Sequence, residues 1–263
     1  MHSARAASTS GTAPEPAAFR TLDGLPFPTL VLSKRKEFLT PVSLQEAIAL
    51  VKAGRRSRFD ETVDLALNLG IDPRRGDQMV RGATELPHGT GRAVRVAVFA
   101  TGQDAIAAQE AGAEVVGGEE LIASIAGGAS LDFDRAVATP AMMPKVGRVA
   151  RILGPRGLMP NPKLGTVTAS PAEAVAALKR GRVEFRADKG GVVHAGLGKR
   201  SFADEALFDN VAAYVAAILA ARPKGLKGGV GGYVKGATLS TTMGVGVPVS
   251  IASLVQAAAA TRA

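Results

Sequence analysis

The sequence predicts two domains of mixed α/β and α+β class: a split α+β domain I built from both ends of the chain, and a Rossmann-like βαβ domain II inserted in it. Three observations lead to this prediction. Strand patterns alternate with helix patterns between residues 91 and 181, which is typical of a parallel sheet with helical crossovers. The strand before residue 90 has no local partner, and an isolated strand is not stable. Further strands and a long helix follow residue 182, so the two ends are expected to pair.

The expected boundaries follow from pattern and composition. Residues 1–40, with repeated Pro, should form an N-terminal extension and linker. Domain I takes residues 41–90 and 182–250, and domain II takes residues 91–181. Residues 251–263 are expected to be a tail, in which the small residues 257–263 have little ability to pack. The two connections, near Gly89–Gly91 and Arg180–Arg182, are expected to form a hinge.

The first part of domain I begins with a helix. Ser43 and Glu46 have the spacing of a capping box, apolar residues then recur at helical spacing, and Gly54 ends the helix. Residues 59–69 alternate between apolar and polar side chains, which predicts a half-buried strand. No helix or strand period fits residues 72–91.

In domain II, strands are expected at 94–100, 114–116 and 133–138, and helices at 103–111, 119–126 and 144–153. A second capping box, Ser170 with Glu173, starts a helix that ends at Gly181. The run from Gly154 to Lys163 holds two Gly, three Pro and two cations. Because Pro fixes φ and removes a backbone donor, this run predicts a stiff exposed loop.

The second part of domain I opens with two short strands, 182–187 and 191–195, which are expected to form a hairpin around Asp188. A long amphipathic helix spans 204–220. A basic, Gly-rich loop follows at 222–232, and a final strand at 233–241 runs into Thr242, Met243 and Gly244.

Composition favours an anionic partner. The net charge is +9 and the isoelectric point about 10.2, a balance that most simply indicates nucleic acid. Residues 182–263 carry 10 Lys and Arg against 5 Asp and Glu, a net of +5. The absence of Cys excludes disulfides and thiolate metal sites, three scattered His residues do not indicate a metal site, and no apolar run reaches the roughly 18 residues of a membrane span.

Motifs for catalysis and nucleotide binding are incomplete. The turn after residue 100, Thr101-Gly102-Gln103, does not have the G-x-G-x-x-G spacing. The stretch Gly198-Lys199-Arg200-Ser201 resembles part of a phosphate loop, but Val193 occupies the place of the upstream Gly. We therefore expect no catalytic residues, no cofactor and no enzyme activity. A nucleotide-dependent enzyme that uses domain II is the alternative.

Other residues suit RNA. Phe59 lies beside Arg58 and could stack on a base, or it could be an ordinary edge-core Phe. Ser240, Thr241 and Thr242 bring three hydroxyls together before Gly244, which suits contacts to RNA 2′-hydroxyls or only strand propensity. Lys189 and Lys199 are phosphate contacts or ordinary surface charge.

The run Gly154–Lys163, followed by Gly165–Thr168, resembles the signature of the ribosomal protein L1 family of the large subunit. Further stretches match in the same order, at 69–73, 80–83, 86–91, 94–99, 111–113, 188–189 and 240–244. The resemblance covers about residues 40–250. It implies a two-domain protein with an inserted domain, in agreement with the pairing argued above.

The resemblance also implies partners. Members bind large-subunit rRNA at the mobile L1 stalk, as monomers within the ribosome, and assist release of deacylated tRNA from the exit site. Bacterial members also repress their own mRNA, so an mRNA-binding repressor is a second alternative. No membrane partner is implied.

Carried over by position, the resemblance implies an rRNA-binding face and a secondary loop. The face comprises Arg58, Phe59, Thr62, Asp188, Lys189, His194, Lys199, Thr242, Met243 and Gly244. The secondary loop contributes Gly154, Arg156, Gly157, Asn161 and Lys163. Gly236 stands where bacterial members often carry Ser, which puts one hydroxyl contact in doubt.

The resemblance to organellar forms concerns three segments. The N-terminal extension, the run Met142–Lys145 and the long loop 228–232 look more like mitochondrial than plastid members. The first residues read equally as a transit segment or as a plain tail. The expected location is the mitochondrial matrix ribosome, with the chloroplast as the alternative.

Overall fold

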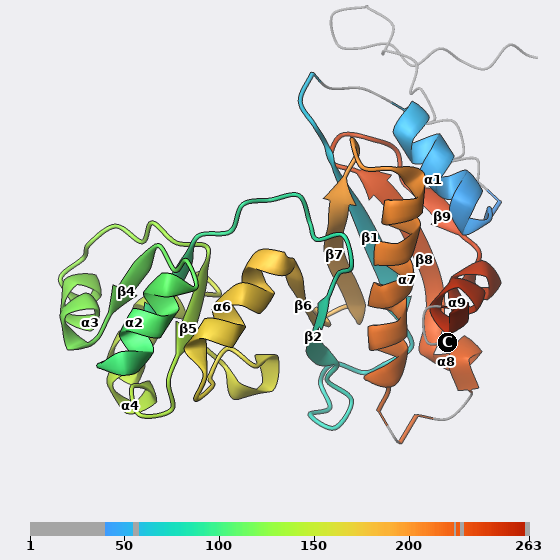
Figure 1. The fold of residues 1–263 in the computed structure, drawn as a ribbon. Helices are drawn as coiled ribbons and strands as arrows, with labels where there is room; N and C mark the ends of the chain where they lie inside the picture. The colour runs from blue at the N-terminus through green and yellow to red at the C-terminus, as the bar shows by residue number, and fades with distance from the viewer. Residues whose placement is uncertain (1–39, 55–57, 224, 227–228, 261–263) are drawn as a thin grey trace, which may run out of the picture. The chain divides into compact units, whose positions relative to one another are not determined.

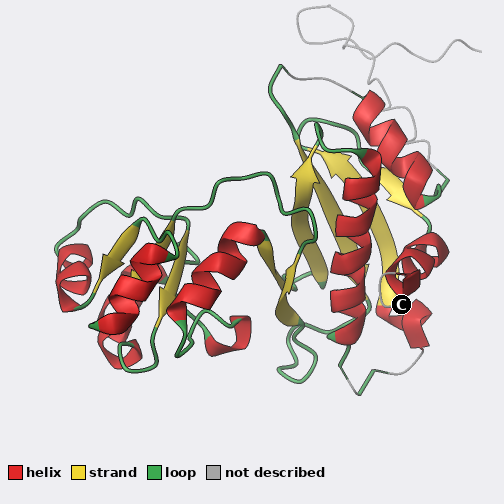
Figure 2. Cartoon of the chain, viewed as in Figure 1, coloured by secondary structure: helices red, strands yellow, loops and turns green. Residues whose placement is uncertain are grey.

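The computed structural model describes residues 40–54, 58–223, 225–226 and 229–260 (Figure 1). The extension at 1–39, with its transit-segment reading, lies outside the described residues. The fold class is as predicted: an antiparallel sheet with helices, built from both ends of the chain, and a parallel sheet with helices, built from the middle (Figure 2). We call the first region domain I and the second domain II.

The main sheet of domain I has four strands in the order β7-β1-β8-β9. These strands are β1 (Thr62–Leu69), β7 (Val192–Lys199), β8 (Val234–Thr241) and β9 (Val247–Val249), and all neighbours are antiparallel. Strand β1 lies between β7 and β8, so a strand from the first part of the chain is held by two from the last part. The expected pairing of the two chain ends is confirmed.

Helices cover one face of this sheet. Helix α1 (Leu44–Ala53) begins at the predicted capping box, with both reciprocal bonds between Ser43 and Glu46 present. It packs with α7 (Asp204–Ala220) and α9 (Ile251–Ala260) on the apolar face of β1, β7 and β8. Every second residue of β1 enters this core, from Val63 to Leu69, because side chains alternate across a strand.

The prediction of a C-terminal tail at 251–263 is wrong for residues 251–260. These residues form α9, which buries Leu254, Ala257 and Ala258 against domain I. Small side chains allow close packing on α7, and Ala has the highest helix propensity. The sequence reasoning treated small residues as unable to pack, whereas here they fit a narrow space between helices.

A second, two-stranded sheet was not predicted. Strand β2 (Arg81–Glu85) lies in the segment without a clear period, and it pairs antiparallel with β6 (Arg182–Arg186). The predicted hairpin is therefore wrong. A turn does close at Asp188, where the Asp188 amide donates to the Val192 carbonyl at 2.9 Å, but β6 and β7 pair with different strands. Phe185 of β6 packs edge-on against Tyr214 of α7.

Domain II has a parallel sheet in the order β4-β3-β5, from Val96–Phe99 (β3), Val115–Gly117 (β4) and Arg135–Ala138 (β5). Two apolar clusters lie on its two faces. One cluster includes α3 (Glu119–Ala126), and the other includes α2 (Gln103–Glu110) and α6 (Pro171–Arg180). Because β3 is covered on both faces, all four of its residues are buried, as expected for parallel strands.

The predicted helix 144–153 is broken into three turns. These are α4 (Met143–Val146), the 3-10 turn η1 (Gly147–Val149) and α5 (Ala150–Leu153). Gly147 stands at the break, and Gly is a poor residue for a helix interior. The box at Ser170 is also incomplete: its hydroxyl contacts the Glu173 carboxylate at 3.1 Å and makes no cap bond to the backbone. Short turns follow at η2 (Pro162–Leu164) and α8 (Gly229–Tyr233).

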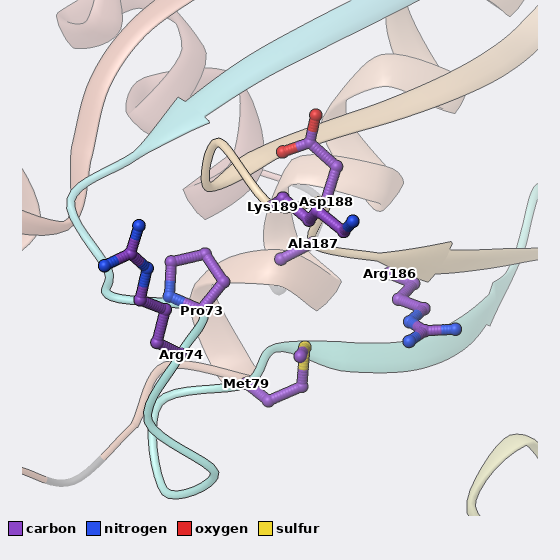
Figure 3. A pocket seen from close by; sticks show the side chains of 7 residues that line it. All are labelled: Pro73, Arg74, Met79, Arg186, Ala187, Asp188 and Lys189. Atoms are coloured by element: carbon purple, nitrogen blue, oxygen red, sulfur yellow. The ribbon is translucent and has the colours of Figure 1, made fainter.

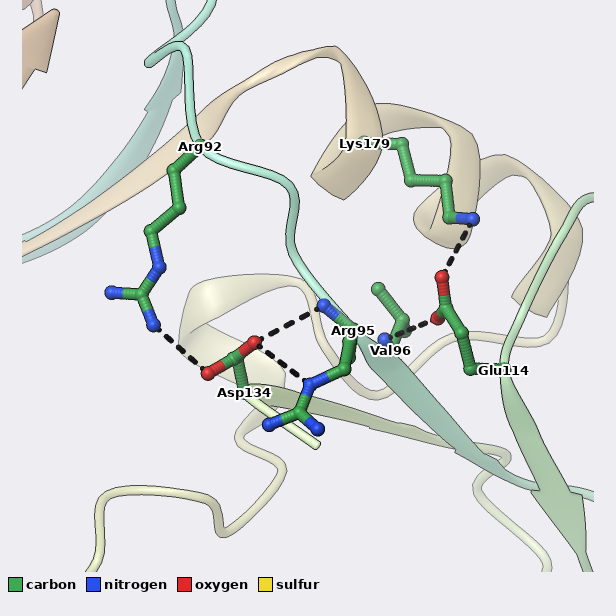
Figure 4. Close-up of polar contacts among 6 residues, drawn as sticks. All are labelled: Arg92, Arg95, Val96, Glu114, Asp134 and Lys179. Carbon is green, nitrogen blue, oxygen red and sulfur yellow. Dashed lines mark hydrogen bonds and ion pairs between the residues drawn. The ribbon is translucent and has the colours of Figure 1, made fainter. Parts of the chain in front are cut away.

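Two carboxylates hold the start of β3 (Figure 4). Asp134 accepts from the Arg95 amide at 3.2 Å and from Arg92 Nη2 at 2.9 Å. Glu114 accepts from the Val96 amide at 2.7 Å and from Lys179 Nζ at 3.0 Å. The Arg95 amide bond is the main cause that lowers the pKa of Asp134. Both carboxylates are therefore paired with cations of domain II.

Candidate nucleic-acid interface

The sheet of domain I presents small and polar side chains on the face away from the helices. On β1 this face carries Asp64 and Ala66, which alternate with the buried Val63 and Leu65. Asp64 lies between Gly196 of β7 and Ser240 of β8. Ala66 lies between His194 and Thr238. This face of the sheet therefore carries small and polar side chains.

At one end of the sheet, three predicted residues meet. Thr62 is paired with Lys199 in the sheet register, and Lys199 Nζ donates to Thr62 Oγ1 at 3.0 Å. The Thr62 amide donates to Thr242 Oγ1 at 3.1 Å, and the Thr242 amide returns a bond to the Thr62 carbonyl at 3.1 Å. Residues from three distant parts of the chain thus form one bonded cluster.

Two large apolar side chains project beside this cluster. Phe59 is 56% exposed and Met243 is 57% exposed, so the reading of Phe59 as a core residue is wrong. Arg58 is also exposed. An exposed aromatic ring and a flexible thioether beside cations are suited to stacking and packing on unpaired bases.

The backbone at Met243 and Gly244 is fixed from below. Glu61 is fully buried, and its carboxylate accepts from the Met243 amide at 3.4 Å. The Gly244 amide donates to the Thr241 carbonyl at 3.1 Å. A Cβ added at Gly244 would lie only 2.2 Å from Thr241 Oγ1, so the turn needs Gly here. Sequence reasoning missed Glu61, although its place beside Thr62 in a strand of period two indicates an inward side chain.

The three neighbouring hydroxyls do not act together. Ser240 lies on the sheet face away from the helices, Thr241 is buried, and Thr242 is exposed. Of the two readings left open for these hydroxyls, Thr241 fits strand propensity, because alternate residues of a strand point to opposite faces. The Thr242 hydroxyl accepts from the Thr62 amide, so it also orders the cluster.

The remaining predicted residues lie toward the other end of the sheet. Strand β7 runs from Val192 to Lys199, a rise of roughly 23 Å, and Asp188 and Lys189 come before its start. His194 is exposed on the sheet face between the two ends. The structure thus divides the predicted face into two groups that are joined by the sheet.

Asp188 shapes the turn before β7. Its Oδ1 accepts from the Val192 and Gly190 amides, both at 2.8 Å. These bonds, with that to Val192 first, lower the pKa of the Asp188 carboxyl. Asp188 therefore positions the turn that carries Lys189, and its charge is already satisfied by backbone donors.

The turn at Asp188 is expected to keep its bonds to unusually low pH. A lowered pKa means that the bonds are complete above the ordinary Asp value of about 4 and are lost only as pH falls through the lowered value. In an NMR titration, the Gly190 and Val192 amide shifts should move with a midpoint below about 4. Asp188→Asn is the control and should abolish this transition. A midpoint at or above the ordinary value contradicts the assignment.

Asp64 is a residue of the face that sequence reasoning did not single out. Burial raises the pKa of its carboxyl, while Lys199 and His194 act in the opposite direction. Asp64 is a charged residue at one of the outward positions of β1, which alternate with apolar inward positions. That charge could have marked Asp64 as part of the face. A carboxylate among cations on this face restrains how closely a phosphate can approach there.

The secondary loop is ordered by its own backbone. Asn161 Oδ1 accepts from the Lys163 amide at 2.9 Å, and the Asn161 amide donates to Thr166 Oγ1 at 2.7 Å. Arg156, Gly157 and Lys163 are exposed. Asn161 therefore serves the shape of the loop. The structure shows the loop as exposed at these positions, and its stiffness stays a prediction. Gly154 and the other loop residues follow α5 in domain II and lie outside the sheet that carries Thr62.

Within the described ranges, no three His, Asp or Glu side chains gather where they would hold a metal ion. In the same part of the chain, no helix is long and apolar enough to cross a membrane.

A comparison with protein families identifies this chain. The model of the family described as "Ribosomal protein L1p/L10e family" matches residues 50–245. The match spans more than half of the chain, from before β1 to just after Gly244, and so includes the cluster at Thr62, the turn at Asp188 and the whole of domain II. The chain therefore belongs to the ribosomal protein L1p/L10e family, an RNA-binding family of the large ribosomal subunit.

Proposed function

We propose that this protein binds the rRNA of the L1 stalk through domain I and assists release of deacylated tRNA from the exit site. The observation that carries the proposal is the cluster of Thr62, Lys199 and Thr242, with Phe59 and Met243 exposed beside it. It combines a cation for phosphate, hydroxyls for ribose and exposed groups for bases, which are the contacts that RNA recognition uses.

The sheet face extends this interface. Between the Thr62 cluster and the turn at Asp188, the face carries Ala66, Gly196 and other small residues beside His194. Around Ala66, small side chains let an RNA backbone approach the sheet, whereas Asp64 keeps phosphates at a distance beside Gly196. In the proposed function, domain I anchors the protein on the stalk, while domain II, with Arg156 and Lys163 exposed on its stiff loop, reaches toward tRNA or neighbouring rRNA.

The location belongs to the same proposal. We infer a mitochondrial ribosome, with a chloroplast ribosome as the alternative, from the extension at 1–40 and the long loop at 228–232. The expected bounds of domain I, at 41–90 and 182–250, and of domain II, at 91–181, also stay part of the proposal. So does a hinge at the two connections between the domains.

Co-sedimentation tests membership and compartment together. Tagged protein should sediment with large subunits when purified mitochondria are lysed and resolved on a sucrose gradient, and it should be absent from chloroplast gradients. Ribosomes depleted of the protein should retain deacylated tRNA in the exit site. Recovery chiefly at the top of the gradient on mRNA would replace this proposal with that of a translational repressor.

A further inference from the structure

A cavity of about 570 Å³ lies in domain I, between the loop that follows β1 and the turn that precedes β7 (Figure 3). Pro73, Arg74 and Met79 line it from the loop, and Arg186, Ala187, Asp188 and Lys189 line it from the other side. The proposed RNA face contains Asp188 and Lys189 but none of the other five residues. The cavity therefore extends that face toward a loop that contributes no residue to the predicted face.

The cavity is preformed by backbone bonds. In the loop, Asp72 Oδ1 accepts from the Arg74 amide at 3.1 Å, and the Asp72 amide donates to Gln78 Oε1 at 2.9 Å. On the other side, the Ala187 amide donates to the Val80 carbonyl at 2.9 Å, which joins the two walls. Because these segments are already bonded in place, a ligand would not lose affinity to the entropy cost of ordering them.

Charge in the cavity is unbalanced. Arg74, Arg186 and Lys189 are exposed, and none has a carboxylate partner within 4.0 Å among the described residues. The one carboxylate, Asp188, accepts from two backbone amides. By contrast, the next cation in the loop, Arg75, is paired with Asp77 at 3.3 Å. Three cations, with Arg74 and Arg186 on opposite sides of the cavity (Figure 3), are therefore left for anions.

The lining is also apolar. Pro73 and Met79 are half-buried and Ala187 is buried, so these side chains form an apolar lining beside the cations (Figure 3). The apolar lining suits a flat aromatic group, and the arginines suit an anion. A nucleotide has both, in its base and its phosphate. The volume lies in the range of small-ligand sites, and single-stranded bases are recognised by stacking and by cationic side chains. A paired base within a duplex would not reach the lining.

We propose that this cavity takes one unpaired nucleotide of the bound RNA. Its base lies on Pro73, Met79 and Ala187. Its two flanking phosphates lie toward Arg74 on one side of the cavity and toward Arg186 on the other (Figure 3). The inference rests on the proposed function and deepens it. One RNA segment would be held at the Thr62 cluster, and the splayed nucleotide would be held roughly 23 Å along β7.

The test uses the full-length protein and a stalk fragment of the large-subunit rRNA from the same organelle. In Arg74→Gln/Arg186→Gln, affinity at 0.15 M salt should fall about tenfold. The slope of log K against log salt should fall by about 1.5 to 2 in magnitude, because two phosphate-contacting cations are removed. Arg75→Gln is the matched control, because this neighbouring cation is already paired with Asp77. It should leave both quantities unchanged.

Crosslinking locates the nucleotide. With 4-thiouridine placed at each unpaired position in turn, one position should crosslink to the peptide that contains Pro73 and Met79, and the double variant should lose that crosslink. Equal losses of affinity in Arg75→Gln and in the double variant would overturn the inference, as would crosslinks confined to other peptides.

The outcomes separate this inference from the proposed function. If the wild-type protein binds the stalk fragment and Met243→Ala weakens binding, but the double variant binds normally, the proposed function stands and the cavity has no role in it. If the wild-type protein does not bind the fragment, both are overturned.

Discussion

Met243→Ala is expected to weaken binding of the stalk RNA by about tenfold, within a range of roughly 1–3 kcal/mol per lost contact. The Met243 side chain is 57% exposed, so it contributes little to the core. Its backbone amide is held by the buried carboxylate of Glu61, and that bond does not depend on the side chain. Truncation should therefore remove an RNA contact and leave the turn in place.

A neighbouring residue supplies the control. Val245 is 54% exposed and lies two positions further along the chain, but it is outside the predicted face. Val245→Ala should bind RNA like the wild type in a filter-binding assay. Both variants should melt within a few degrees of the wild type. Equal affinity for Met243→Ala and the wild type would remove this end of the sheet from the interface.

The sequence predicted those elements whose side-chain period matches their burial. Strand β1 alternates from Val63 to Leu69 because one of its faces is core and the other is accessible. Strand β2 was missed because four of its five residues are half-buried and the fifth is exposed, so no alternation marks it. The failed hairpin has a different cause. A turn at Asp188 is a local property, but the partners of β6 and β7 are chosen by residues more than 90 positions away.

The candidate site was predictable in its residues but not in its division of roles. Resemblance supplied Thr62, Thr242 and Met243, and the structure brings them together. The resemblance does not reveal that the Thr242 hydroxyl is bonded to the Thr62 amide, or that the Glu61 carboxylate holds the Met243 amide. These roles depend on the register in which β1 pairs with β8. The two strands are far apart in the sequence, so local patterns do not predict that register.

Asn210→Leu is expected to lower the free energy of unfolding of domain I by about 3 kcal/mol. Asn210 is fully buried in α7. Its Nδ2 donates to the Leu197 carbonyl at 2.7 Å and to the Gly89 carbonyl at 2.9 Å, and its Oδ1 accepts from the His88 amide at 3.0 Å. Leucine has a similar size but satisfies none of these groups, and a buried polar group left without a partner costs about 1–3 kcal/mol.

Tyrosine fluorescence isolates the effect on domain I. The protein has no Trp and two Tyr, and both Tyr214 and Tyr233 lie in the core of domain I. Urea unfolding followed by this signal therefore reports on domain I alone. Asp209→Asn is the matched control, because Asp209 precedes Asn210 and makes only an exposed contact to His88. It should change stability by less than about 0.5 kcal/mol.

The same variant tests how the two parts of the chain are joined. His88 and Gly89 belong to the first connection toward domain II, and Leu197 belongs to β7, two residues before Lys199. Asn210 therefore fixes both a connection and the strand that carries Lys199, the proposed RNA-binding cation. A loss of stability together with weaker RNA binding at temperatures where the protein is folded would show that the two are coupled through this amide. A loss of stability below about 1 kcal/mol would mean that water replaces the missing bonds. The prediction that Asn210 holds the connection and β7 together would then be wrong.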